Sequence, residues 1–280
     1  MFLIATEFCD PRGSAFIGEM ITVQWNDRAA KAFSLDAQLA IITGGGTGLG
    51  FAMASCLAAS GARVVIAGRR ADVLQDAAAR LGDSVFAEQY DVTELDSAQA
   101  FVARVEERYG APGILINNAG VHVKKTLEEH TIEDFHRTLA THVEGAFAIT
   151  RAVAPAMKRA GRGSILFTAS MSSLIGMPRI VAYSAAKSAY LGMVRSLAAE
   201  LGGCNVRVNA IAPGWIETPM LHQALDGDPE RRQKILDRTP QQRFGSPEDI
   251  GWAAAFLCSP AASFINGVVL PVDGGASIGF

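Results

Sequence analysis

Two side chains that could share a proton lie four residues apart in the segment AYSAAKSA, as Tyr183 and Lys187. On a helix this spacing places both on one face, so the lysine ammonium can lie beside the phenol. A nearby positive charge favours the phenolate and lowers the tyrosine pKa from about 10. We therefore expect Tyr183 to act as an acid and base near neutral pH. Such pairs also arise by chance on helices, so the other motifs must support this interpretation.

A glycine-rich turn, TGGGTGLG, joins the apolar run LAIIT to the alanine-rich run FAMASCLAAS. After a strand and before a helix, such a turn lets the backbone approach a pyrophosphate, whose charge the helix N-terminus stabilises. The turn therefore predicts a dinucleotide-binding loop, and a simple strand-to-helix connection is the alternative. The residues assigned to cofactor binding here are Gly44, Thr47, Gly48, Leu49 and Gly50.

The residues after the next β-type run bear on the choice of cofactor. NAD-specific proteins place an acidic residue about 20 residues beyond the glycines, against the ribose 2′-hydroxyl. This chain has Gly68 there, followed by Arg69 and Arg70. Because a guanidinium group suits a 2′-phosphate, we expect NADP as the cofactor, with NAD as the alternative. A solvated, basic start of a helix would also explain the two arginines.

From Gln38 onward, short β-branched runs alternate with longer alanine-rich stretches. This alternation indicates βαβ units and a parallel sheet with helices on both faces. We predict an α/β fold, a single Rossmann-type doubly wound domain over residues 35–280 with about seven parallel strands flanked by helices. The expected strands are LAIIT, RVVIA, SVFAEQYDV, ILINNA, SILFTAS, VRVNAIAP and VVLPV. The expected helices cover residues 49–60, 71–81, 95–109, 132–160 and 183–201.

Two segments fall outside this alternation. Residues 1–34 show no clear period and are expected to form an N-terminal extension, unless the protein starts at Met20. Residues 217–247 are rich in charge and proline and follow the end of a strand, where open α/β sheets bind ligands. We expect residues 217–247 to be a lid over the substrate, because long insertions in compact domains usually have a function. A solvated pair of surface helices is the alternative.

The composition limits the class of partner. The 280 residues are 49% hydrophobic and 19% charged, and the net charge is −3. These values favour one large domain, and they supply no strong field for nucleic acid or an anionic membrane surface. We expect a small-molecule substrate. The two long uncharged stretches, residues 37–62 and 252–272, contain glycines or prolines and do not suggest membrane spans.

The four cysteines are far apart, and no Cys-x-x-Cys pair or zinc-type histidine spacing accompanies them. This pattern indicates reduced thiols in a cytoplasmic protein with no metal and no disulfide. The apolar start of the chain has no basic region before it and is interrupted by Glu7, which argues against a secretory signal.

Several motifs occur together, in one order, from about residue 35 to the end. They are TGGGTGLG, Asp91 in YDVTE, NNAG at 117–120, Ser170, Tyr183 with Lys187, PGWIET at 213–218 and VDGG at 272–275. Ser170 precedes Tyr183 by 13 residues. Taken jointly, these motifs resemble the short-chain dehydrogenase/reductase family.

The resemblance implies hydride transfer between a nicotinamide and an alcohol or ketone. Tyr183 would exchange the proton of the substrate oxygen, Ser170 would hydrogen-bond that oxygen, and Lys187 would tune Tyr183 and hold the nicotinamide ribose. The resemblance also places cofactor contacts at Asp91, Val92, Asn118, Ala119, Gly120, Tyr183, Lys187, Pro213, Gly214, Ile216 and Thr218. For Asp91 a helix cap is the alternative role, for Pro213 a loop stop, and for Ser170 a turn hydroxyl.

One position departs from the family pattern. Many relatives have an asparagine in the long central helix, where it holds a water that relays protons to the lysine. In ATHVEGAF the matching residue is His142. Histidine can also donate and accept, so His142 is a candidate for the proton relay, with an altered pH dependence. A packed structural histidine is the alternative.

The resemblance is strongest to gluconate 5-dehydrogenases and other sugar or polyol dehydrogenases, and it extends to 3-oxoacyl-acyl-carrier-protein reductases. Next to the expected pocket, His122, Lys124, Lys125 and Arg179 could pair with a sugar-acid carboxylate or form a solvated rim. A catalytically idle NADP-binding sensor or scaffold is a third interpretation, but such a protein should have lost part of the Ser170, Tyr183 and Lys187 set. Members of the family usually form dimers or tetramers, and we expect a homotetramer through residues 132–160, 183–201 and the apolar tail.

Overall fold

The structure is a computed structural model that describes residues 27–218, 221–222 and 225–279. Most of the expected N-terminal extension, residues 1–26, therefore lies outside the described residues. Residues 27–33 form a helix that precedes the first strand.

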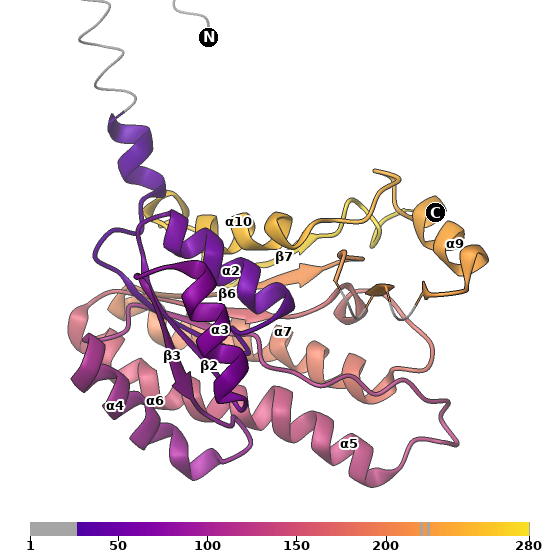
Figure 1. Cartoon of the computed structure of the whole chain (residues 1–280), viewed down its shortest axis with the longest axis horizontal. Coiled ribbons are helices and arrows are strands. Elements are labelled where there is room, and N and C mark those ends of the chain that lie inside the picture. The colour runs from indigo at the N-terminus through magenta and orange to yellow at the C-terminus, as the bar shows by residue number, and fades with distance from the viewer. Residues whose placement is uncertain (1–26, 219–220, 223–224, 280) are drawn as a thin grey trace, which may run out of the picture.

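The core of the fold is one sheet of seven parallel strands in the order β3-β2-β1-β4-β5-β6-β7. This confirms the predicted single, doubly wound α/β sheet (Figure 1). The strand order reverses between β1 and β4, where ligands bind in such sheets. The strands are β1 (Leu39–Thr43), β2 (Arg63–Gly68), β3 (Val85–Gln89), β4 (Ile114–Asn117), β5 (Gly163–Thr168), β6 (Val206–Pro213) and β7 (Val269–Val272).

Helices cover both faces of the sheet. One face packs on α2 (Gly48–Ala59), α3 (Ala71–Leu81) and α10 (Pro247–Cys258). The other packs on α4 (Ala98–Tyr109), α6 (Gly145–Ala160) and α7 (Val181–Leu201). The remaining helical elements are α5 (Ile132–Leu139), α9 (Pro229–Arg238), the π-helical turn η2 (Ala140–Glu144) and the 3-10 turns η1 (Leu95–Ser97), η3 (Met171–Ser173), η4 (Gly202–Cys204) and η5 (Pro260–Ala262).

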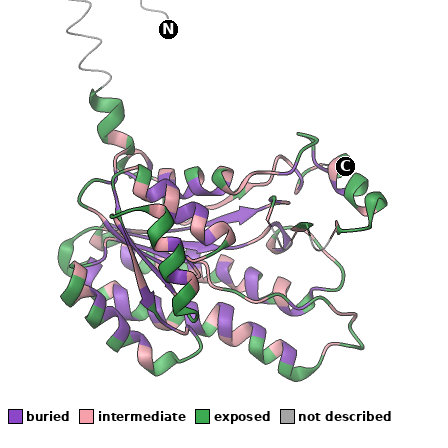
Figure 2. Ribbon diagram, viewed as in Figure 1, coloured by how far each residue is buried: buried purple, intermediate pink, exposed green. Residues whose placement is uncertain are grey.

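Alternating side chains of the strands build two separate cores. Ile41 and Leu115 face α4, α6 and α7, whereas their neighbours Ile42 and Ile116 face α2, α3 and α10. Because both faces are covered, the central strands are largely continuous apolar runs. Figure 2 shows the consequence: the central strands are buried, and the helices that cover the sheet are buried mainly on their inner sides.

Two differences from the predicted helices affect how the sheet is covered. The single helix expected over residues 132–160 is divided into α5 and α6 by the π-helical turn η2. Helix α10 was not predicted, because its buried side is built largely from small residues and gives little apolar periodicity. A Cβ on Gly251 would lie 2.5 Å from the Sγ of Cys56, so α10 and α2 approach each other closely.

The segment 217–247 leaves and rejoins the body at nearly one point. Ile216 and Gly245 form an isolated parallel bridge, in which the Glu217 N–H donates to the Gly245 carbonyl at 2.8 Å. The Gly245 N–H donates to the Trp215 carbonyl at 2.9 Å. Helix α9 lies in the segment between these two residues and is mostly exposed.

In the part of the chain that the structure describes, no helix has both the length and the apolar character needed to cross a membrane.

Candidate active site

The motifs expected to bind and react all follow the carboxyl ends of neighbouring strands. The glycine-rich loop follows β1, the NNAG motif spans the end of β4, Ser170 follows β5 and the PGWIET motif spans the end of β6. Because the strands are parallel, these ends meet at one edge of the sheet. The fold therefore brings together residues that are far apart in the sequence.

The glycine-rich loop has the geometry of a phosphate cradle. Gly44 and Gly48 have φ angles of 67° and 54°, the left-handed region that favours glycine. Helix α2 begins at Gly48, and its N-cap residue Thr47 makes no side-chain cap. The first N–H groups of α2 have no intrahelical partner, so they can bind an anion. A Cβ on Gly48 would meet nothing within 4 Å, so space for a ligand adjoins these groups.

Two further features hold the loop in this shape. Gly50 approaches the Gly44 carbonyl so closely that a Cβ on Gly50 would lie 2.2 Å from its oxygen. The Asn118 side-chain amide donates to the carbonyls of Thr43 and Gly44 at 3.1 and 3.2 Å. The Asn118 and Ala119 N–H groups donate to Thr43 Oγ1 at 3.0 and 3.1 Å. The Asn118 side chain thus helps to position the glycine-rich loop.

The two arginines after β2 are exposed and available to a ligand. Neither the Arg69 nor the Arg70 guanidinium has a hydrogen bond or an ion pair within the described residues. Gln89 Nε2 donates to the Arg69 carbonyl at 2.9 Å, which fixes the backbone there. Arg70 is the N-cap residue of α3 but makes no side-chain cap. This is the donor chemistry that a ribose 2′-phosphate requires.

Asp91 has a structural role that leaves part of its carboxylate available. Its Oδ1 accepts hydrogen bonds from the N–H and Oγ1 of Thr93 at 2.9 and 2.8 Å. Asp91 thus makes a local turn contact with Thr93 and not the helix cap considered as its alternative role, and its Oδ2 atom has no partner within the described chain. The next residue, Val92, is buried in the core beside α6.

The candidate catalytic residues converge at the start of α7. Ser170 Oγ lies within hydrogen-bonding reach of the Tyr183 phenol and also accepts from the Ser172 N–H at 3.1 Å. Lys187 is 3% exposed, and its Nζ donates to the Thr168 carbonyl at 2.5 Å. The Lys187 Nζ lies 5.6 Å from the centre of the Tyr183 ring. Ser170, Tyr183 and Lys187 are thus neighbours where β5 ends and α7 begins.

The expected lowering of the Tyr183 pKa is wrong for this structure. Shielding of the phenol from water raises the Tyr183 pKa, and the Ser170 hydrogen bond only partly opposes this. Burial also lowers the pKa of Lys187 to about 7. The lysine is directed at the Thr168 carbonyl and not at the phenol oxygen, and its charge is itself disfavoured near neutral pH. Tyr183 is therefore protonated at neutral pH.

His142 lies beside the ring of Tyr183. It is on the π-helical turn η2, it is 1% exposed, and its ring is nearly perpendicular to that of Tyr183 at a centroid distance of 5.5 Å. Burial, followed by the charge of Lys187, lowers the His142 pKa to about 3. His142 is neutral at ordinary pH, and its Nδ1 is buried without a partner in the described chain.

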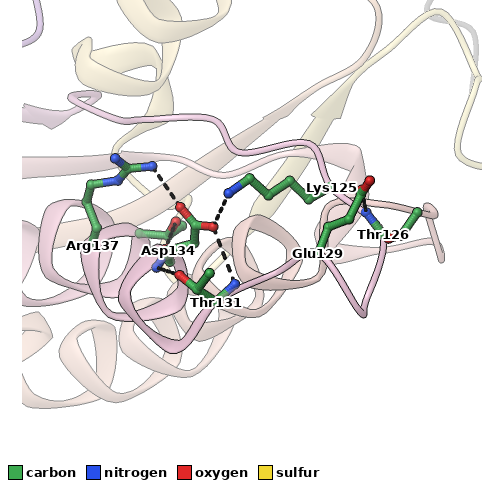
Figure 3. Close-up of polar contacts among 7 residues, drawn as sticks. Lys125, Thr126, Glu129, Thr131, Asp134 and Arg137 are labelled. Atoms are coloured by element: carbon green, nitrogen blue, oxygen red, sulfur yellow. Dashed lines mark hydrogen bonds and ion pairs between the residues drawn. The ribbon is translucent and has the colours of Figure 1, made fainter.

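The basic residues next to the expected pocket divide into two groups. Lys125 pairs with Asp134 at 2.5 Å, and Asp134 also bonds Arg137 and the Thr131 N–H (Figure 3). This pairing with Lys125 lowers the Asp134 pKa. Lys125 therefore stabilises the start of α5 through Asp134.

His122 and Lys124 are on the other side of the same loop and face the site. The His122 ring lies 4.9 Å from that of Tyr183, edge to face. Partial shielding from water and the charge of Lys124 lower the His122 pKa. The Lys124 pKa is lowered by partial burial and then by the charges of Arg231 and Arg179, so these three basic groups are neighbours.

The loop after β6 closes the site on the far side. Gly214 packs on β7, where a Cβ would lie 2.6 Å from the Asp273 Cα. Ile216 is buried at the base of segment 217–247, and Thr218 Oγ1 accepts from the Leu221 N–H at 3.3 Å. Trp215 Nε1 is buried and has no partner in the described chain.

Several site residues had no signal in the sequence. Thr43 supports the NNAG motif, Thr168 accepts from Lys187 through its carbonyl, and the Tyr190 hydroxyl donates to the His142 carbonyl at 2.6 Å. Thr168 accepts this hydrogen bond through its backbone carbonyl, so its residue type gives no sign of the role. Tyr190 could have been noticed because it lies one helical turn beyond Lys187.

In the described residues, no group of three or more His, Cys, Asp or Glu side chains is arranged to hold a metal ion.

Known proteins with similar sequences and structures match nearly the whole chain. A family model described as enoyl-(acyl carrier protein) reductase matches residues 44–277. A D-threitol dehydrogenase of Mycolicibacterium smegmatis is 38% identical over 88% of this chain and 95% of its own length. A 3-oxoacyl-acyl-carrier-protein reductase of Thermotoga maritima is 35% identical over 87% of this chain and 99% of its own length.

Among solved structures, a gluconate 5-dehydrogenase from Burkholderia cenocepacia J2315, in complex with NADP and tartrate, superimposes with a TM-score of 0.86. It is 34% identical in sequence, and the match covers 90% of this chain and 100% of the other. These similarities agree with the loop, the strand order and the serine, tyrosine and lysine arrangement described above. The chain therefore belongs to the short-chain dehydrogenase/reductase family of NAD(P)-dependent oxidoreductases.

Proposed function

We propose that this protein transfers hydride between NADP and a secondary alcohol or the corresponding ketone, with a sugar, sugar acid or polyol as the substrate. The observation that carries the proposal is the contact of Ser170, Tyr183 and Lys187 beside an intact glycine-rich loop. The similarity to polyol and gluconate dehydrogenases supports the substrate class.

The proposed chemistry assigns one task to each side chain. Tyr183 donates a proton to the ketone oxygen in reduction and removes it from the alcohol in oxidation. Ser170 donates a hydrogen bond to the same oxygen and stabilises its developing negative charge. Lys187, whose Nζ lies beside the Tyr183 ring, holds the neighbouring ribose hydroxyls. When bound, the nicotinamide accepts or donates the hydride.

The cofactor would be held along the carboxyl edge of the sheet. The residues we assign to it are Gly44, Thr47, Gly48, Leu49, Gly50, Arg69, Arg70, Asp91, Val92, Asn118, Ala119, Gly120, Tyr183, Lys187, Pro213, Gly214, Ile216 and Thr218. The free N–H groups at the start of α2 support the pyrophosphate position. The exposed guanidinium groups after β2 support NADP rather than NAD.

Changing both arginines should therefore change the cofactor preference. In an Arg69→Ala, Arg70→Ala double variant we expect KM for NADP to rise at least tenfold, because each lost charged hydrogen bond contributes about 1.5–3 kcal/mol. KM for NAD, which has no 2′-phosphate, should change less than twofold. Initial rates with both cofactors measure this, and Arg80→Ala on the outer face of α3 is the matched control. Equal losses with NAD and NADP would contradict the assignment.

An acidic substrate is supported by the basic groups at the mouth of the site. Lys124 faces the same side of its loop as His122, which contacts Tyr183. Arg179 and Arg231 are close enough to Lys124 to lower its pKa. The carboxylate of Asp228 already offsets part of the repulsion between these cations, and a substrate carboxylate between them would offset more.

The substrate class is tested with initial rates against gluconate, 5-ketogluconate, glucose, several polyols and a short 3-oxoacyl thioester. Turnover of the sugar acid with NADP would support the proposal. Turnover of the thioester instead would assign the chain to the 3-oxoacyl-acyl-carrier-protein reductases. No turnover of any alcohol or ketone would favour the idle NADP-binding alternative.

We also propose that residues 217–247 act as a lid over the substrate. The bridge at Ile216 and Gly245 fixes the base of this segment, and a cavity of about 450 Å³ lies within it. Protection of α9 from hydrogen exchange when NADP and substrate bind together would support the lid. Unchanged exchange would favour a surface helix instead.

The assembly we propose is a homotetramer in the cytoplasm. Large apolar side chains remain exposed on one chain, among them Phe147 on α6, Trp252 on α10 and Phe264. Such side chains suit burial between subunits. The thiols of Cys56, Cys204 and Cys258 are free, which suits a reducing compartment. Light scattering should give a mass near four times 29.6 kDa, and a monomeric mass would contradict the assembly.

A further inference from the structure

Strand β3 is the edge strand of the sheet next to β2 (Figure 1). The register pairs Gln89, the last residue of β3, with Gly68, the last residue of β2. The turn after Gly68 contains Arg69 and Arg70 and leads into α3. We call residues 69 and 70 the arginine turn. An edge strand has a paired neighbour on one side only, so other contacts must hold its end in place.

Buried Glu88 holds the end of β3 against helix α4. The residue is 5% exposed, and its carboxylate accepts hydrogen bonds from the Tyr109 hydroxyl at 2.9 Å, from Arg108 and from Arg104 Nε at 3.4 Å. Arg104 also donates to the Gln89 carbonyl at 3.4 Å. Displacing a buried carboxylate from such donors is costly, because a charge is left unpaired. The residue before Gln89 is therefore fixed to α4.

The Gln89 side chain connects this fixed strand end to the arginine turn. Its Nε2 donates to the Arg69 carbonyl at 2.9 Å, the usual length of an amide hydrogen bond. Gln89 is exposed, so the contact is not imposed by burial. Because the peptide unit is planar, holding the Arg69 carbonyl also directs the Arg70 N–H away from Gln89. One side-chain amide thus sets the orientation of the peptide between the two arginines.

The helix that follows the arginine turn packs on the glycine-rich loop. A Cβ on Gly46 would lie 3.3 Å from side-chain atoms of Val73 and Leu74, in the first turns of α3. The Leu74 N–H donates to the Arg70 carbonyl at 3.1 Å. The arginine turn is therefore held at two places, by Gln89 at its start and by α3 and the glycine-rich loop at its end.

We propose that Gln89 is a positioning residue for cofactor selection: its side-chain amide holds the Arg69 carbonyl, so that the arginine turn presents both guanidinium groups to a ribose 2′-phosphate. Both arginine side chains are long and exposed. A fixed backbone reduces the conformational entropy that is lost when they bind one phosphate. The proposal rests on the proposed function, because only a cofactor with a 2′-phosphate responds to the position of this turn.

Gln89→Met tests the hydrogen bond directly, because methionine has nearly the size of glutamine but no N–H to donate. We expect Kd for NADPH, measured by fluorescence titration, to rise about 3- to 10-fold, the effect of one neutral hydrogen bond. Kd for NADH should change less than twofold. Kd for adenosine 2′,5′-bisphosphate, measured by calorimetry, should rise as it does for NADPH. Gln75→Met, at an exposed glutamine of α3, is the matched control and should change none of these values.

Three results would overturn the proposal. Equal losses for NADPH and NADH would show that Gln89 supports the adenosine site as a whole. Unchanged affinity for both cofactors would show that the hydrogen bond to Arg69 has no effect on binding. Wild-type protein that binds NADPH no more tightly than NADH would overturn the role of Gln89 together with the choice of NADP.

A second set of variants tests whether Gln89 acts through the arginines. In the Arg69→Ala, Arg70→Ala background the turn has no guanidinium group to present. Adding Gln89→Met there should raise Kd for NADPH less than twofold, and the difference from its effect in the wild type is the coupling that a double-mutant cycle measures. The full 3- to 10-fold loss in this background would show that Gln89 contacts the cofactor itself, which would overturn the positioning role.

These titrations need no substrate, so they separate the role of Gln89 from the proposed function. Selective NADPH binding that depends on Gln89, without turnover of any alcohol or ketone, would refute the proposed function and support the role of Gln89. Turnover with NADP, together with a ratio of NADPH to NADH affinity that is the same in wild type and Gln89→Met, would refute the role of Gln89 alone.

Discussion

Replacing Tyr183 by phenylalanine should lower kcat by about 10²–10⁴, the range that a positioned acid or base contributes. The substitution removes one oxygen atom and leaves the ring in contact with His122 and His142. Binding of NADPH should therefore change little. Steady-state rates with the best substrate of the panel, and fluorescence titration of NADPH, measure the two quantities.

The matched control for Tyr183→Phe is Tyr90→Phe. Tyr90 is also a buried tyrosine, it stacks on Phe101 at 4.3 Å, and its hydroxyl has no partner in the described chain. Its loss should change kcat less than twofold. A Tyr183→Phe enzyme with more than a tenth of the wild-type kcat would refute the acid and base role.

The raised pKa of Tyr183 gives the direction of the pH dependence. Ketone reduction needs the protonated phenol, so its rate should fall as the pH rises through the Tyr183 pKa. Alcohol oxidation needs the phenolate, so its rate should increase over the same range. Rates in both directions between pH 6 and about 11 would test this, and parallel profiles would contradict it.

Replacing Lys187 by methionine should have opposite effects on activity and stability. We expect a loss of at least 100-fold in kcat/KM, because the amine beside the Tyr183 ring and its proposed ribose contact disappear. The unfolding free energy near pH 7 should rise, because the structure no longer buries a charge. The unpartnered Thr168 carbonyl offsets part of this gain, by about 1–3 kcal/mol.

The pH dependence of that stability gain follows from the sign of the pKa shift. Folding lowers the Lys187 pKa from 10.5 to about 7. Between these values the unfolded chain binds more protons, so the stability of the wild type rises with pH in this window. The advantage of Lys187→Met should thus be largest at or below pH 7 and shrink towards pH 10.5. Chemical denaturation across pH measures this, and a constant difference would contradict the burial argument.

The fold was predictable because its signals are local and repeated. β1, β2 and β6 are short apolar runs with turn residues after them, and their bounds nearly match the prediction. α3 matches its predicted range of residues 71–81. Helix α10 could not be predicted from the sequence, because small residues such as Gly251 make its buried face resemble an apolar loop. The division of α5 from α6 depends on tertiary contacts, such as that of Tyr190 with the His142 carbonyl.

The residues of the site were predictable, but their electrostatics were not. Spacing placed Tyr183 and Lys187 on one helical face, yet it gave no information on burial. Burial raises the Tyr183 pKa and lowers the Lys187 pKa, opposite to the tuning expected from spacing. Likewise the charge of Lys125 was visible in the sequence, but its partner Asp134 became clear only in three dimensions.

The bridge between Ile216 and Gly245 has a consequence for how this protein could change over time. Segment 217–247 leaves and rejoins the sheet at one hydrogen-bonded pair of residues. Insertions or exchanges between these two residues would leave the register of β6 and β7 intact, and with it the hydride-transfer machinery. Natural variants with new substrates should therefore differ most within this segment, and a segment transplanted from a relative should bring its substrate preference with it.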